Sequence, residues 1–382
     1  MRTRDPEQWI IPTVVIATTS IVIGAIWDIS WHMTVGRDSL FTAPHVLEQL
    51  GAAVSGSVSG AYVLWLTFRA PAAAKARTVK FWGFDGPLGA WLVIWGAITM
   101  IVSVPFDNWW HGAYGLDVQI LSPPHTILMA GILGIQIGIL LFTLAAQNRT
   151  QPEGDVGTGR YPDDTFQRHR NGSTAFVYAS GVLIMMVALA PYEITGYANA
   201  WHRSLFYNVT AGGFPILLLG IARTARARWP ATSAAAIYMG IMLATMWILQ
   251  LIPAVPKLAP IYNPVTHMVP LAFPFVLVLP ALTIDLLERQ RGRIRSDWLH
   301  ALFAGIAFVS VMFIVHWFFA YFMLSPHARN FLFGADQWPY MYQVREWRHQ
   351  FWFPIGAGAS SKVWPIAWAL FIGTLLATVS AR

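Results

Sequence analysis

The chain has 382 residues, of which 56% are hydrophobic and only 11% are charged. This composition excludes an ordinary soluble domain and predicts an all-α, polytopic integral membrane protein. The sequence contains no cysteine, which excludes thiolate metal sites and iron–sulfur clusters.

Apolar runs near the twenty residues that a membrane-spanning helix needs recur along the whole chain. They predict about ten transmembrane helices arranged as helical hairpins. The first run has no small-residue cleavage site, so we expect it to remain as a helix and not to be removed as a signal peptide. The expected spans are 10–29, 46–68, 86–106, 125–146, 173–192, 205–224, 231–253, 268–287, 298–322 and 363–380.

The basic residues predict the orientation of these spans. Most of the 25 Lys and Arg residues fall in loops on the side that holds both termini. The positive-inside rule therefore predicts cytoplasmic termini in a bacterial-type inner membrane. The net charge of +7 follows from this topology, and the Arg-rich loops need no nucleic acid partner.

The polar stretch 148–172 is rich in Gly, Pro and charged residues, and it predicts a cytoplasmic linker. It would separate a four-helix membrane part, 1–147, from a six-helix part, 173–382. The second part contains an aromatic loop, 325–364, on the predicted outer side. This loop suits an interfacial cap, or a docking surface for an electron donor or a partner subunit.

One polar pattern occurs twice, in each case where an apolar helix is expected to leave the membrane. An Asp is followed four residues later by a His, and a second His follows a proline at the start of the next apolar run. Residues four apart share one face of a helix, and a short loop can bring the second His back to them. The two copies comprise Asp28, His32 and His45, and Asp107, His111 and His125.

Two imidazoles and one carboxylate suit copper, zinc or non-haem iron, and the spacing does not choose among them. The alternative is structural, because Trp31 and Trp110 each precede a His, and Trp is enriched where membrane meets water. A duplicated set of ionisable groups at membrane depth favours the metal interpretation, since such groups are costly and tend to mark function.

The run from Trp31 to His45, WHMTVGRDSLFTAPH, resembles the copper-site segment of the C subunit of membrane-bound methane and ammonia monooxygenases. The second copy resembles the neighbouring second copper motif of that subunit, except that Asp107 stands where the family usually has Asn. The resemblance covers roughly residues 20 to 145. It implies copper at both copies, with Asp38 and Asp117 holding the imidazoles in orientation.

Three functions are consistent with these features. In the first, Asp28, His32 and His45 are the catalytic residues of a copper monooxygenase subunit that hydroxylates a small apolar or ammonia-like substrate at a site facing the periplasm. The resemblance then implies a trimer with further membrane and cupredoxin subunits. In the second, the chain is a non-catalytic copper-binding, copper-handling or sensing protein. The third is a transporter, although its polar groups would cluster at one face and not at the midplane.

Overall fold

The computed structural model describes residues 6–36, 39–115, 122–149, 163–195, 204–255, 265–294, 296–323 and 325–334, with short pieces between 371 and 379. Within these residues the chain is mostly helical, and seven helices are long and apolar enough to cross a membrane. The chain is therefore an α-helical, multi-pass membrane protein. It divides into two compact units, one formed by 1–28 and 39–183 and the other by 29–38 and 184–382.

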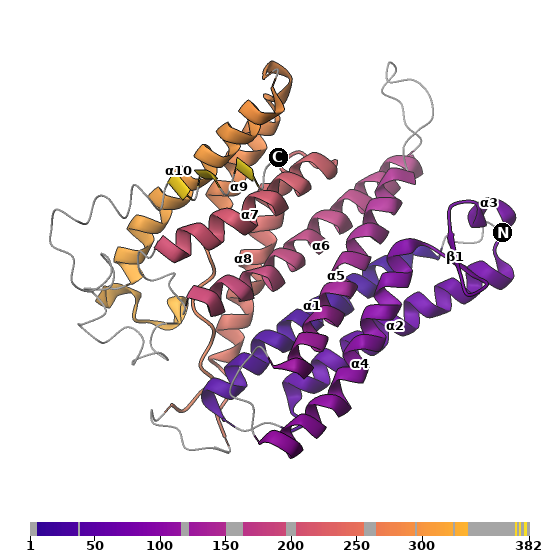
Figure 1. Cartoon of the computed structure of the whole chain (residues 1–382), viewed down its shortest axis with the longest axis horizontal. Helices are drawn as coiled ribbons and strands as arrows, with labels where there is room; N and C mark the ends of the chain where they lie inside the picture. Colours follow the sequence, from indigo (N-terminus) through magenta and orange to yellow (C-terminus); the bar gives the residue numbers. More distant parts are fainter. Residues whose placement is uncertain are drawn as a thin grey trace. The chain divides into compact units, whose positions relative to one another are not determined.

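Among the described residues the first unit contains four long helices, the first two thirds of a fifth and a small hairpin (Figure 1). The last turn and a half of its first helix belongs to the second unit. The elements are α1 (Glu7–Thr34), α2 (Ala43–Arg69), α3 (Ala72–Lys75), β1 (Val79–Phe81), β2 (Phe84–Gly86), α4 (Leu88–Tyr114), α5 (Pro123–Arg149) and α6 (Asp163–Thr195).

Glycines allow α4 and α5 to pack backbone against backbone. A Cβ atom at Gly96 would lie 2.6 Å from the carbonyl oxygen of Gly131, and one at Gly89 would lie 2.5 Å from that of Gly138. Small residues at this spacing let membrane helices approach closely, where van der Waals packing drives their association. The hairpin that carries the second polar copy is therefore held rigidly.

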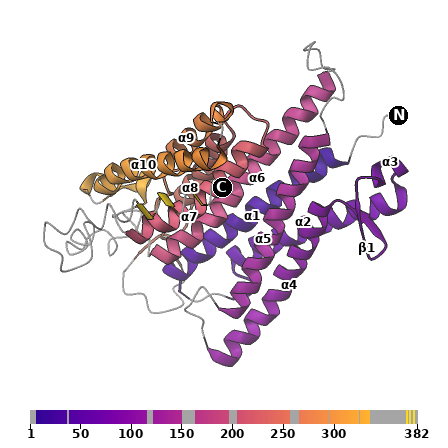
Figure 2. The same ribbon diagram turned by 45° about the horizontal axis from the view of Figure 1, so that its top comes forward.

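The strands β1 and β2 form an antiparallel hairpin between α3 and α4, at the opposite end of α4 from Tyr114 (Figure 2). Its turn is made by Trp82 and Gly83, which both have positive φ angles, 48° and 85°. The pattern of apolar runs did not predict this hairpin, because its strands are only three residues long.

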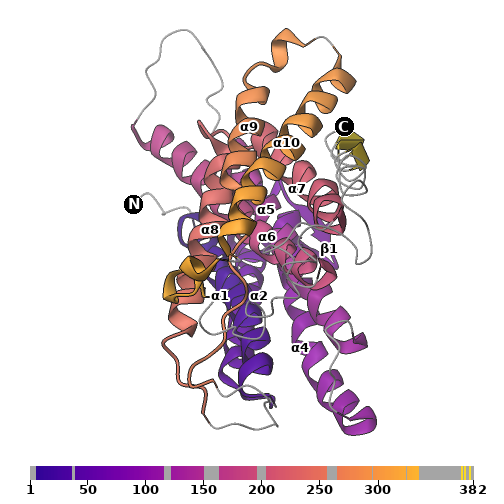
Figure 3. The ribbon, with the colours of Figure 1, turned by 90° about the vertical axis from the view of Figure 1, so that its left-hand side faces the viewer.

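In the second unit α9 packs against three neighbouring helices (Figure 3). These are α7, α8 and α10, and short 3-10 turns follow α9 and α10. The bounds are α7 (Ser204–Thr224), α8 (Pro230–Leu249), α9 (Val278–Glu288), η2 (Arg291–Arg293), α10 (Asp297–Met323), η3 (Pro326–Ala328) and η4 (Phe331–Phe333).

The helix expected over 268–287 is wrong for its first half. Residues 265–277 form no regular helix, and α9 begins only at Val278. Pro270 and Pro274 explain the difference, since each removes a backbone N–H and disfavours a helical conformation in the residue before it. An apolar run can thus satisfy the length criterion for a span without forming a helix.

The non-helical residues are largely buried, and side chains satisfy their backbone groups. Val269 N–H donates to Thr34 Oγ1 at 2.9 Å, and Ser30 Oγ donates to the carbonyl of Val269 at 2.5 Å. Further along, Phe275 N–H donates to the hydroxyl of Tyr238 at 2.9 Å. In addition, the Tyr192 hydroxyl donates to the carbonyl of Phe273 at 2.8 Å. Irregular backbone among membrane helices requires such partners.

Two other expectations fall partly outside the described residues. The linker predicted at 148–172 is helical from Asp163, because α6 begins there and runs without interruption into an apolar segment. The aromatic loop 325–364 is described only as far as residue 334, and most of the span expected at 363–380 lies outside the described residues.

Candidate metal centre

The first copy of the motif joins α1 to α2. Asp28 lies on α1, and His45 lies in the first turn of α2, where Pro44 suits the start of a helix. His45 Nδ1 donates to the carbonyl oxygen of Ser39 at 3.0 Å, and its Nε2 lies 3.2 Å from Asp28 Oδ1. One ring nitrogen is thus held by the backbone, which aims the other at the carboxylate.

The third residue of this copy, His32, lies on α1 four residues after Asp28. Its side chain is exposed, and it belongs to the stretch of α1 assigned to the second unit. Asp28 and His32 thus lie four residues apart on one helix, as the sequence predicts. Asp38 lies outside the described residues.

Glu48 is an acidic residue next to this copy that the sequence motif did not include. It lies three residues after His45 on α2, and it is only 2% exposed. Its Cγ atom would be 2.5 Å from a Cβ built at Gly24, one turn before Asp28 on α1. Glu48 interacts electrostatically with both Asp28 and His45. The signal in the sequence was a lone carboxylate inside an apolar run, at i+3 from a candidate ligand.

In the second copy both histidines lie close to the same carboxylate oxygen of Asp107. Asp107 Oδ1 lies 3.5 Å from His111 Nε2 and 3.7 Å from His125 Nε2. Asp107 and His111 occupy the last turns of α4, which is capped by Gly115 with φ 89°, and His125 is the third residue of α5. The predicted return of the second His is confirmed here. Asp117 lies outside the described residues.

The donor types in both copies fit copper, which accepts imidazole and carboxylate ligands. In the second copy Asp107 Oδ1 and His125 Nδ1 are buried and make no hydrogen bond within the described part of the chain. However, no group of three or more His, Cys, Asp or Glu side chains among the described residues surrounds a point where an ion could be held. The side chains are arranged as Asp–His contacts, and metal binding would require them to reorient.

Ionisable groups also cluster in the second unit, but they form a structural network. Arg223 Nε lies 3.0 Å from Glu288 Oε1, and His300 Nε2 lies 3.5 Å from the same oxygen. Asp285 accepts hydrogen bonds from the N–H groups of Ala231 and Thr232, at 3.2 Å and 2.9 Å, and so caps α8. An oppositely charged partner or a cap for each carboxylate accounts for their burial.

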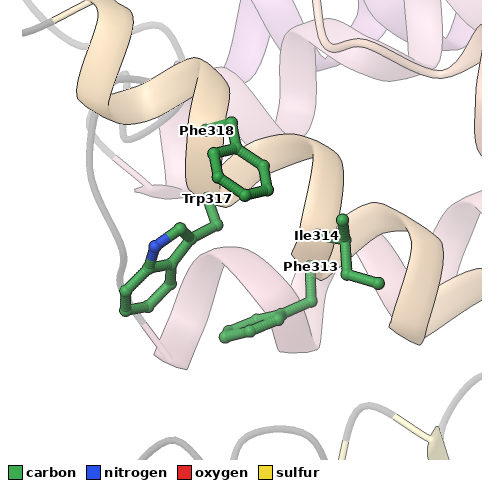
Figure 4. A pocket seen from close by; sticks show the side chains of 4 residues that line it. All are labelled: Phe313, Ile314, Trp317 and Phe318. Atoms are coloured by element: carbon green, nitrogen blue, oxygen red, sulfur yellow. The ribbon is translucent and has the colours of Figure 1, made fainter.

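An apolar pocket of about 270 Å³ opens on α10 and is lined by Phe313, Ile314, Trp317 and Phe318 (Figure 4). None of these side chains can ligate a metal. The pocket belongs to the apolar surface of a helix that can span the membrane, and it does not contribute to the metal centre.

No protein-family model, no curated protein and no solved structure matches this chain.

Proposed function

We propose that this chain is a copper-binding membrane protein similar to the C subunit of membrane-bound methane and ammonia monooxygenases. Asp28, His32 and His45 would hold one copper ion, and the second copy would hold another. With ten spans and both termini in the cytoplasm of a bacterial-type inner membrane, both copies face the periplasm. The sequence resemblance and the charge distribution support this assignment.

A single observation carries the proposal. In both copies the histidine that begins the next helix lies next to the aspartate of the preceding helix, with Nε2 to Oδ1 distances of 3.2 Å for His45 and 3.7 Å for His125. If these residues served only as anchors at the membrane interface, the same Asp–His pairing would not be required in both copies. Ionisable residues at the ends of apolar helices that converge in pairs favour a ligand-binding role.

Each side chain then has a defined part in the first site. The hydrogen bond to Ser39 orients His45. His32 follows Asp28 by four residues on α1 and would supply the second imidazole, and the carboxylate of Asp28 would lower the net charge of a bound ion. Asp38, and Asp117 in the second copy, would hold the imidazoles in orientation. Copper bound there would supply one-electron and oxygen chemistry, which no protein side chain provides.

As an enzyme subunit, the chain would take part in the oxygen-dependent hydroxylation of a small apolar or ammonia-like substrate. The resemblance implies a trimer with a further membrane subunit and a cupredoxin subunit. A non-catalytic copper-handling or sensing role is the second candidate. It is favoured by Asp107 in place of the family's Asn, and by residues 146–382, for which the resemblance offers no counterpart.

Metal analysis with electron paramagnetic resonance tests the proposal. The purified chain, the variants His32→Ala and His111→Ala, and the control His327→Ala, an exposed histidine in a 3-10 turn, are loaded with copper. We expect nitrogen hyperfine structure in the wild type and in the control, with one copper lost in each site variant. Equal copper, or equal zinc, in all four proteins would refute the ligand assignment. Oxygen-dependent turnover with partner subunits then separates the enzyme from the copper-handling protein.

A further inference from the structure

Aromatic side chains gather on the outside of the β1–β2 hairpin, together with the ends of α2 and α4 that flank it. Trp82 is 76% exposed and Phe68 is 71% exposed, while Phe81 and Trp95 are each more than a third exposed. We call these four residues and the neighbouring basic residues Arg69, Lys75, Arg77 and Lys80 the hairpin surface.

The hairpin lies along a helix that can span the membrane. The ring centroids of Trp82 and Trp95 are 5.5 Å apart, and those of Phe81 and Trp95 are 6.0 Å apart. Trp95 lies seven residues after Leu88, the first residue of α4, which corresponds to about 10 Å along the helix axis. In a membrane spanned by α4, the tip would lie where aromatic rings meet the boundary between headgroups and acyl chains.

The backbone of Trp82 is strained, with a φ of 48° that glycine or asparagine adopts far more readily. Strain of this kind persists when other interactions compensate for it. The indole contacts the neighbouring rings of Phe81 and Trp95, and most of its surface is exposed in the described part of the chain. An apolar environment around the exposed indole would compensate for this strain.

The charges beside these rings are mainly positive. Arg69, Arg77 and Lys80 are exposed, and Lys75 Nζ donates to the carbonyl of Thr67. Two carboxylates lie nearby, since Asp85 stands opposite Lys80 in the hairpin and Glu7 lines a cavity of about 180 Å³ together with Arg77. Within the described residues no ion pair joins Asp85 to these four cations, and Glu7 accepts a hydrogen bond from the Tyr62 hydroxyl. The balance is four basic residues against two acidic ones.

We propose that the hairpin surface binds an anionic phospholipid, with the phosphate at Arg77 and Lys80 and an acyl chain against Phe81, Trp82 and Trp95. Adjacent cationic and aromatic groups at the membrane boundary match the two parts of such a lipid. The hairpin lies on the side where we place the termini, and anionic lipids are concentrated in the cytoplasmic leaflet. This inference does not depend on copper binding.

Native mass spectrometry of the detergent-purified chain, titrated with phosphatidylglycerol or phosphatidylcholine, tests the proposal. We expect the wild type to bind phosphatidylglycerol more tightly. The double variant Arg77→Gln/Lys80→Gln should lose about tenfold or more in affinity for it, because each basic residue near the lipid surface contributes about fivefold. Trp82→Ala should weaken binding of both lipids.

The control Arg228→Gln/Arg293→Gln removes two exposed basic residues from the second unit, and it should retain wild-type affinity. Equal affinity of the wild type for the two lipids would overturn the proposal. The same conclusion follows if both double variants bind phosphatidylglycerol equally. Displacement of the lipid by millimolar inorganic phosphate would assign the site to a free anion instead.

Discussion

His45 Nε2 lies 3.2 Å from Asp28 Oδ1, and this contact joins the first turn of α2 to α1 across a loop that carries the most specific part of the motif. The same relation recurs between His125 and Asp107 at 3.7 Å. Two helical hairpins thus present an aspartate to a histidine in the same manner. The pairs are only partly exposed, with side chains 19% to 28% accessible, so they are reachable by a small ion but shielded from bulk solvent.

Replacing His45 by Gln should remove copper from the first site and leave the second site filled. The amide keeps the approximate size of the ring but is a poor copper ligand. Copper per chain, measured after dialysis by mass spectrometry of the metal, should fall to the amount bound by the second copy alone. His327→Gln serves as the control, since His327 is an exposed residue of η3. Unchanged copper in His45→Gln would remove this residue from the ligand set.

Glu48→Gln should weaken copper binding at the first site without abolishing it. Glu48 is buried beside the site and interacts with Asp28 and His45, so the substitution alters a group that acts on both of these candidate ligands. Groups that support metal ligands typically change affinity by about 10- to 100-fold. A competition titration against a copper chelator measures the effect. Asp85→Asn, in β2 next to the far end of α2, makes the same acid-to-amide change and should leave the affinity unchanged.

Gly96→Ala should destabilise the α4–α5 hairpin. The added methyl group would lie 2.6 Å from the Gly131 carbonyl oxygen and 2.7 Å from Ile135 N, which are backbone atoms that cannot move aside singly. Overpacking of this kind costs about 1–3 kcal/mol. The apparent melting temperature in detergent should fall, whereas Gly60→Ala, where nothing lies within 4 Å of the new methyl, should hold or raise it. An equal response of the two variants would contradict the close packing.

Asp285→Ala should destabilise the second unit by about 2 kcal/mol, because it uncaps α8 and leaves its N–H groups without an acceptor. Asp285 is 3% exposed and also accepts from Thr232 Oγ1 at 2.7 Å. Asp297→Ala is the matched control. Its side chain is 58% exposed and lies 3.6 Å from Arg291, and an exposed pair of this kind is worth less than about 1 kcal/mol. Thermal unfolding in detergent compares the two, and similar shifts would count against the capping role.

Tyr238→Phe tests the support of the non-helical segment. Without the hydroxyl, the buried N–H of Phe275 would lose its acceptor. An unsatisfied buried donor lowers the free energy of unfolding by about 1–3 kcal/mol. We expect a lower melting temperature. We also expect faster amide hydrogen exchange at residues 268–277. Tyr114→Phe removes a hydroxyl from a residue that is 68% exposed, and it should change neither measurement. Normal protection in Tyr238→Phe would show that the segment does not rely on this bond.

The sequence alone determined the class of protein, because the length and apolar character of the runs require helices in a membrane. It also determined the i, i+4 spacing of Asp28 with His32 and of Asp107 with His111, since both pairs lie within a single helix. Local periodicity is sufficient for such features. Local periodicity is not sufficient to locate every span. At residues 265–277 closely spaced prolines prevent a helix although the pattern is apolar.

Only the tertiary structure decided which groups meet between helices. The pairing of His45 with Asp28 and the position of Glu48 against Gly24 depend on how α1 packs on α2, and no local pattern encodes that. The same holds for the β1–β2 hairpin, where Phe81 and Trp82 contact Trp95 of α4, a contact between separate elements. Sequence periodicity reports the face that a helix buries, whereas the partner of that face depends on the packing of the whole unit.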